Sequence, residues 1–298
     1  MPPERVQINY HFEAFEAVAP IIDLAIKQDF KRRISQIYII VGVYYSMVEE
    51  DFPKATKYLE KSLRISEELQ DIVSLATGNF WLGETLTYNC EFEKAFYHIN
   101  TAIDINMAAN NLWGSSSVKG VLSFFTYHFQ GQLNMGYNTS DEAIRIAEEV
   151  GDIYSKAMAY TCHGISYYGK GRLIEATKYL LKGADFCEKI NLFVWNAIAH
   201  QYLGESYFEI GDFEKSKYHY DKAIRLTERN RLHPSWINLN NLALARVDVM
   251  NDEKNINLEM LLEYEKENKL KVCDGWMPKY LGEVLLNIGV LSASVHEK

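Results

Sequence analysis

The spacing of apolar residues predicts helices along most of the chain. Between residues 93 and 105, apolar side chains recur in steps of three and four, which places them on one face of an α-helix. These residues are Ala95, Phe96, Ile99, Ala102, Ile103 and Ile105. Residues 216–226 have the same spacing, at Tyr220, Ala223, Ile224 and Leu226. The chain has only 6 Pro and 17 Gly in 298 residues, which favours an all-α fold over a turn-rich β protein.

The helical pattern repeats with a period of about 40 residues, and three landmarks share that period. A small residue lies inside the first helix of each pair, at Gly42, Gly83, Gly164 and Gly204. The turn between the two helices falls at Asp51, Glu91, Gly131, Gly171, Gly211 and Asn251. The second helix ends at Gln70-Asp71, Asn111-Leu112, Gly151-Asp152, Asn191-Leu192, Asn230-Arg231 and Asn268-Lys269. Gly and Asn tolerate the left-handed conformation that ends a helix, so their recurrence there predicts paired helices.

The landmarks divide the chain into three parts. Residues 1–34 form an N-terminal half repeat or capping helix, in which Pro20 kinks or splits the helix. Residues 35–275 form six helix pairs, at roughly 35–69, 73–110, 116–150, 154–190, 194–229 and 235–267. Residues 276–298 form a C-terminal capping helix or a truncated repeat, because Leu281-Gly282-Glu283 matches Leu82-Gly83-Glu84 and no second helix follows. The chain could therefore be a piece of a longer protein.

The repeats resemble tetratricopeptide (TPR) repeats. The TPR pattern of a Leu-Gly pair, an aromatic residue and small residues in the second helix appears as Leu203-Gly204-Tyr207-Ala223 and Leu82-Gly83-Ala95-Ala102. The resemblance covers about residues 35–290 and implies a right-handed superhelix, or α-solenoid, of antiparallel helix pairs. The long period is similar to the C-terminal helical arrays of bacterial class III nucleotide cyclases and related ATPase regulators. No cyclase catalytic domain or P-loop is matched, so that resemblance implies no such activity.

Composition and charge exclude several classes of partner. The net charge of −9 argues against nucleic acid and against an anionic membrane surface. No stretch approaches 18 uncharged apolar residues, and the N-terminus has no apolar signal core. Cys90, Cys162, Cys187 and Cys273 form no CxxC pair, which predicts free thiols in a reduced, cytoplasmic protein.

No pattern of catalytic, cofactor-binding or metal-ligating residues is present. Gly169-Lys170-Gly171 lacks the rest of a phosphate loop and falls where the repeat predicts a turn. The eight His are scattered without an HExxH motif, so we predict no metal site. Cys162 and His163 are adjacent on a helix and point about 100° apart, so they cannot act as nucleophile and base. We therefore expect a non-catalytic protein without a cofactor.

TPR arrays bind ligands along the concave surface formed by their first helices, and the resemblance implies a groove of this kind. The implied groove is aromatic and mildly acidic. The candidate residues are Phe80, Trp81, Glu84, Tyr88, Phe125, His128, Phe129, Tyr168, Gln201, Tyr202, Glu205, Phe208, Asn238 and Asn241. The alternative for each aromatic residue is packing between neighbouring helices. No cation occupies the positions that clamp a peptide carboxylate in some TPRs, which disfavours an acidic tail and favours a neutral to basic partner.

Two functions fit these features. The first is a scaffold that binds a protein or peptide in the groove. The alternative is a regulatory module of a bacterial signalling protein that senses a small molecule there. We also expect a homodimer through the last helix, whose apolar face contains Val284, Leu285, Ile288 and Leu291.

Overall fold

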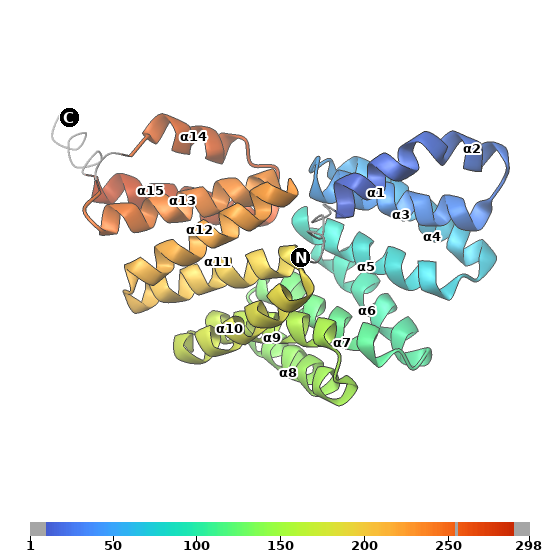
Figure 1. Cartoon of the computed structure of the whole chain (residues 1–298), viewed down its shortest axis with the longest axis horizontal. Helices are drawn as coiled ribbons and strands as arrows, with labels where there is room; N and C mark the ends of the chain where they lie inside the picture. The colour runs from blue at the N-terminus through green and yellow to red at the C-terminus, as the bar shows by residue number, and fades with distance from the viewer. Residues whose placement is uncertain (1–9, 254–255, 289–298) are drawn as a thin grey trace, which may run out of the picture.

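The computed structural model describes residues 10–253 and 256–288, and every element in these residues is helical (Figure 1). Six helix pairs follow one another along the chain. They are α3 (Lys31–Met47) with α4 (Phe52–Leu69), α5 (Ile72–Tyr88) with α6 (Phe92–Ala108), α7 (Leu112–Val121) and the π-helix η2 (Leu122–His128) with α8 (Leu133–Val150), α9 (Ile153–Gly169) with α10 (Leu173–Ile190), α11 (Phe193–Ile210) with α12 (Phe213–Asn230), and α13 (Pro234–Met250) with α14 (Leu258–Lys266). The prediction of an all-α solenoid of antiparallel helix pairs is confirmed.

Shorter elements flank the six pairs. The first helix is split as expected at Pro20, into α1 (Tyr10–Val18), the 3₁₀ turn η1 (Ala19–Ile21) and α2 (Ile22–Lys27). After α14 come the 3₁₀ turn η3 (Lys271–Cys273) and α15 (Trp276–Asn287).

The turn inside each helix pair contains one residue with positive φ. These residues are Glu50, Cys90, Gly131, Gly171, Gly211 and Asp252, each at or next to its predicted position. In two pairs an aspartate follows the turn and caps the second helix: Asp51 accepts from the Lys54 N–H and Asp212 from the Lys215 N–H. Such caps satisfy N–H groups that have no partner within the helix.

Glycines allow the two helices of a pair to approach closely. A Cβ placed on Gly83 would lie 2.5 Å from Ile99 Cγ1, and one on Gly204 would lie 2.8 Å from the Tyr220 ring. The third pair has Phe124 where the first, second, fourth and fifth pairs have glycine, and its small residue lies on the second helix instead. A Cβ on Gly136 would lie 3.2 Å from the Ser123 carbonyl oxygen.

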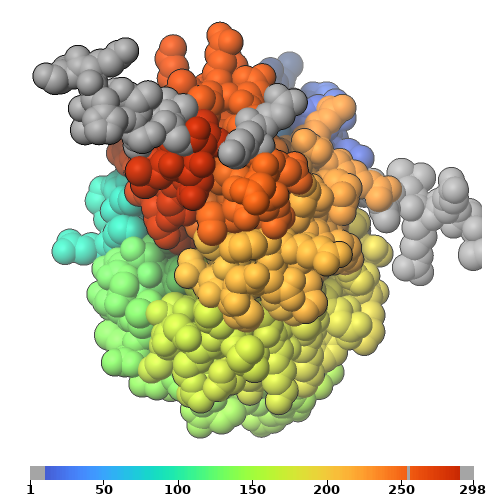
Figure 2. Space-filling model, turned by 90° about the vertical axis from the view of Figure 1, so that its left-hand side faces the viewer, coloured from blue at the N-terminus to red at the C-terminus, as the bar shows by residue number. Residues whose placement is uncertain are grey.

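The array bends until its two ends touch. The His233 N–H donates to the Met47 carbonyl oxygen over 2.7 Å, which joins the end of α3 to the start of α13. Next to this contact, the Ser235 N–H and hydroxyl both donate to the buried Glu50 carboxylate. The helices therefore curve around a common centre (Figure 1), and buried side chains fill this centre. The flank formed by α10 to α15 is closely packed (Figure 2).

The last helix is covered within the chain. Helix α15 packs against α13, and Met277, Tyr280 and Val284 are buried there. Leu285 and Ile288 are half-buried, and Leu291 lies outside the described residues. The homodimer was predicted from the apolar face of α15. Helix α13 covers most of that face within the same chain, because the buried core continues past the sixth helix pair to α15.

Candidate functional site

Six of the fourteen predicted groove residues are buried inside the superhelix. They are Glu84, Tyr88, Phe125, Gln201, Tyr202 and Glu205. The expectation that these six line an accessible groove therefore requires correction. Because the array closes on itself, first helices of distant pairs meet and cover one another's inner faces.

The buried aromatic residues form one continuous cluster. Tyr202 contacts the rings of Phe124, Tyr168 and Trp276, with centroids 5.4–6.2 Å apart. Tyr88 contacts Phe125 in an edge-to-face arrangement at 5.5 Å. Offset and edge-to-face pairs of this kind stabilise a core beyond their buried area. These aromatic residues therefore pack between helices, which was the alternative to a position in the groove.

Glu205 belongs to a buried ion pair. Its carboxylate accepts from Arg246 Nη2 at 3.0 Å, and Tyr280 also donates to it. The Arg246 guanidinium lies 3.7 Å from the Phe208 ring centroid. A buried carboxylate needs such a partner, because desolvation penalises an isolated charge. Glu205 and Phe208 thus hold α13 and α15 against α11.

The other candidates are partly accessible. His128, Phe129, Tyr168 and Phe208 lie at the edge of the aromatic cluster. Asn238 borders a shallow depression beside Glu50 and Lys269, and Asn241 is half-buried on α13. Phe80 and Trp81 line a pocket. The binding role predicted for these eight residues stays a prediction.

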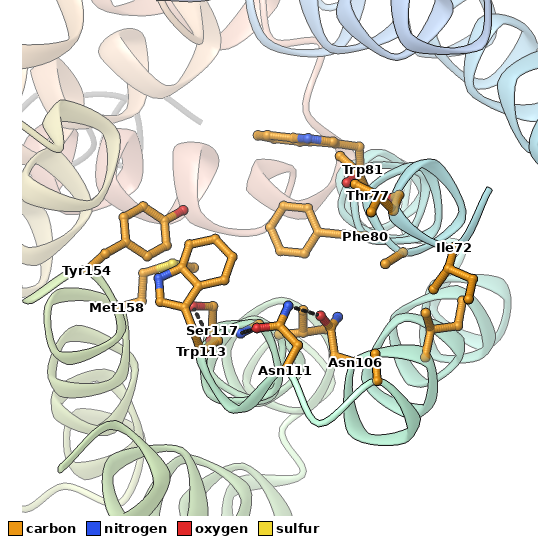
Figure 3. A pocket seen from close by; sticks show the side chains of 16 residues that line it. Ile72, Thr77, Phe80, Trp81, Asn106, Asn111, Trp113, Ser117, Tyr154 and Met158 are labelled. Carbon is orange, nitrogen blue, oxygen red and sulfur yellow. Dashed lines mark hydrogen bonds between the residues drawn. The ribbon is translucent and has the colours of Figure 1, made fainter. Parts of the chain in front are cut away.

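That pocket lies between α5, the α6–α7 junction and α9, and has a volume of about 300 Å³ (Figure 3). We call it the α5–α9 pocket. Its lining residues are Ile72, Val73, Ala76, Thr77, Phe80, Trp81, Ile105, Asn106, Ala109, Asn111, Trp113, Gly114, Ser117, Val118, Tyr154 and Met158. Phe80 and Trp81 lie on one side, edge to face at 5.0 Å, and Trp113 and Tyr154 lie on the other, stacked at 5.1 Å.

Two amides are held in place at the floor of the pocket. Asn111 Nδ2 donates to Asn106 Oδ1 over 2.7 Å, and Asn111 Oδ1 accepts from the Gly114 N–H. Gly114 is required here, because a Cβ would lie 2.1 Å from Asn106 Oδ1. Pre-oriented amides within an apolar wall can orient a ligand that has both apolar and hydrogen-bonding groups.

Most of the pocket was not predicted. Ile72 and Val73, at the start of α5, are 56% and 74% exposed, and Trp113, at the start of α7, is 44% exposed. Ile72 and Val73 directly follow the capping residue Asp71, and Trp113 lies two residues after the capping residue Asn111. Large apolar side chains just after a cap, where a helix start meets solvent, are the signal that could have identified them.

Glu84 lies one helical turn after Phe80 and Trp81. Its carboxylate accepts a hydrogen bond from the Tyr88 hydroxyl over 2.8 Å. Burial raises the pKa of Glu84 to about 7, and the Tyr88 bond only partly offsets this. Burial and then the Glu84 charge raise the pKa of Tyr154, on the opposite wall, to about 12.

Other chemistry finds little support in the described part of the chain. No cluster of three His, Cys, Asp or Glu side chains with metal-binding geometry occurs there. Cys90 is exposed, and Cys162, Cys187 and Cys273 are buried as free thiols. No described helix is long and apolar enough to cross a bilayer. The cytoplasmic location stays a prediction.

Comparison with known proteins identifies the repeat. The family model described as "Tetratricopeptide repeat" matches residues 197–230. No curated protein sequence matches the chain.

Three solved structures share its fold. A Rap protein complexed with competence and sporulation factor is 15% identical, with a TM-score of 0.60 over 88% of this chain and 76% of that one. A STAND protein with a tetratricopeptide repeat sensor, from Pyrococcus horikoshii, is 19% identical, with a TM-score of 0.57 over 89% of this chain and 42% of that one. BtubC from P. vanneervenii is 12% identical, with a TM-score of 0.53 over 74% of this chain and 90% of that one.

These identities are low enough that the likeness concerns the fold alone. This chain spans less than half the length of the STAND protein. Residues 197–230 therefore match a tetratricopeptide repeat, and the recurring helix pairs give the whole described chain a TPR-like fold.

Proposed function

We propose that the chain is a non-catalytic TPR module that binds a peptide or protein segment in the α5–α9 pocket. The observation that carries this proposal is the pocket itself. It combines four aromatic rings with two fixed amides, and Ile72, Val73 and Trp113 expose apolar surface at its edge. Exposed apolar surface around a concave site is typical of a binding site.

The fold comparisons favour binding over catalysis. The Rap protein of similar fold is complexed with competence and sporulation factor, and the STAND protein uses its repeats as a sensor. An extended segment suits the pocket, because its side chains can contact the rings while its amides bond to Asn106 and Asn111.

Selection from a random linear-peptide display library tests the proposal. Synthetic copies of the enriched peptides would be titrated by calorimetry into the wild-type chain, into Trp113→Ala and into Tyr97→Ala. Tyr97 is a matched control, because its ring is 65% exposed on α6 and lies outside the pocket.

We expect Trp113→Ala to weaken binding at least about ten-fold, since aromatic anchors dominate such interfaces. Tyr97→Ala should change it less than about two-fold, as for residues outside the contact. The proposal is wrong if no peptide binds saturably, or if every selected peptide binds Trp113→Ala as well as the wild type.

A second candidate function is sensing of a small molecule within a signalling protein of the nucleotide cyclase or ATPase regulator type. The volume of about 300 Å³ favours it, because small-molecule sites begin at that size. A metabolite that raises the melting temperature of the wild type but not of Trp113→Ala would support it.

A further inference from the structure

Glu84 is a buried carboxylate without a cationic partner among the described residues. Three glutamates are buried there: Glu50, Glu84 and Glu205. Glu50 accepts two hydrogen bonds from Ser235, and Glu205 pairs with Arg246. Glu84 is 5% exposed, and the Tyr88 hydroxyl is its one hydrogen-bond donor. When it is ionised, Glu84 therefore has no opposite charge beside it.

The repeat explains why Glu84 has no internal cation. Glu84 and Glu205 occupy the same place in the Leu-Gly-Glu triplets of the second and fifth pairs, 121 residues apart. Arg246 lies on the first helix of the next pair, and the residue 121 positions before it is Phe125. Phe125 is buried against Tyr88, so a phenyl ring fills the site that the guanidinium fills in the later repeat.

The histidines near this wall do not supply the charge. His11 packs edge-on against Trp81, and His233 lies 3.4 Å from the Tyr88 hydroxyl. Burial lowers the pKa of His11 to about 4 and that of His233 to about 3. Both imidazoles are therefore neutral at pH 7.

The surrounding rings suit a cation. The chain already holds cations between a glutamate and aromatic rings: Arg246 between Glu205 and Phe208, and Lys182 at 3.9 Å from the Tyr160 ring centroid and 3.9 Å from Glu148. Aromatic faces attract ammonium and guanidinium groups, most strongly where water is excluded. Phe80 and Trp81, one turn before Glu84, provide such faces on the same side of α5.

We propose that the peptide bound in the α5–α9 pocket carries an arginine or lysine whose charged group pairs with Glu84. This inference rests on the proposed function and specifies its ligand. The aliphatic part of the side chain lies against Phe80 and Trp81. Phe125 fills the place that corresponds to Arg246, and Glu84 does not itself line the pocket, so the charged end reaches the Glu84 carboxylate by entering between the pocket rings. The net charge of −9 also favours a basic partner during the encounter.

A double-mutant cycle tests the pairing. The selected peptides would be made with each arginine replaced by citrulline, or each lysine by acetyl-lysine, which removes the charge. Both versions would be titrated into the wild type, Glu84→Gln and the control Glu149→Gln. Gln keeps the size of Glu84 and an oxygen for Tyr88, and Glu149 is an exposed carboxylate with the same charge change.

We expect one peptide cation whose neutralisation weakens wild-type and Glu149→Gln binding at least ten-fold but leaves Glu84→Gln binding within two-fold. If binding depends on Trp113 but the cation and Glu84 show no coupling, the pairing is overturned and the proposed function stands. If no peptide binds in a Trp113-dependent way, both are overturned. A melting curve on Glu84→Gln verifies that it is folded.

Discussion

At the scale of single residues, the molecule treats equivalent positions differently. Glu84 and Glu205 follow the same Leu-Gly pair. Glu205 has the buried Arg246 beside it, whereas the position equivalent to Arg246 in the earlier repeat holds Phe125, which packs on Tyr88. In a repeat protein, equivalent residues have the same backbone position in each repeat, but their side chains can have different neighbours. The position with the uncompensated charge is therefore where we look for an external partner.

The raised pKa of Glu84 predicts how stability depends on pH. An acid whose folded pKa, about 7, exceeds its unfolded value of 4.5 stabilises the fold fully below pH 4.5 and loses that contribution as pH rises through 7. In the folded chain Tyr88, Tyr154 and His233 do not change charge in this window, and their titration in the unfolded chain is common to the wild type and a Glu84 variant. The loss is at most about 3 kcal/mol by linkage.

Urea unfolding of the wild type and Glu84→Gln at pH 5 and pH 8 measures this effect. The variant should gain stability relative to the wild type as pH rises. A pH-independent difference between the two would show that the Glu84 carboxyl does not titrate in that window.

At the scale of helices, small residues decide how closely each pair packs. This part of the structure was predictable, because Gly83 and Gly204 recur with the period and turns follow at fixed positions. The π-helical segment η2 was not, since nothing in the pattern indicated that Phe124 would displace the small residue to Gly136 on the second helix.

Gly204 and Gly282 offer a matched pair of substitutions. Gly204→Ala should destabilise the chain by about 1–2 kcal/mol, because the overpacking against Tyr220 exceeds the gain in helix propensity. Gly282→Ala should stabilise it by up to about 1 kcal/mol, because a Cβ there meets nothing within 4 Å. Denaturant unfolding measures both, and equal effects would contradict the close-packing account.

At the scale of the whole molecule, closure of the array decides which residues are accessible. Met47 and His233 touch although the whole central part of the chain separates them. The array closes because each helix pair is rotated slightly relative to the one before it, and these rotations add up over several pairs. A local sequence pattern does not predict the total rotation. That is why Tyr202 and Glu205 were predicted on a concave surface and lie instead in the core.

Ser235→Ala tests the closure contact. It removes the hydroxyl that donates to Glu50 and accepts from the Lys269 N–H, at an expected cost of about 1–3 kcal/mol. Hydrogen exchange should accelerate around residues 47–52 and 232–236, while α9 and α10 stay protected. Unchanged exchange at both ends would mean that this contact does not hold the array closed.

The central claim is that the α5–α9 pocket is the place where a partner binds. Photo-crosslinking tests it most directly, with p-benzoylphenylalanine in place of Thr77, inside the pocket, or of Tyr97, outside it. The account predicts that a selected peptide crosslinks at position 77 and not at position 97, as read by mass spectrometry. Crosslinking at position 97 alone, or equally at both positions, would contradict it.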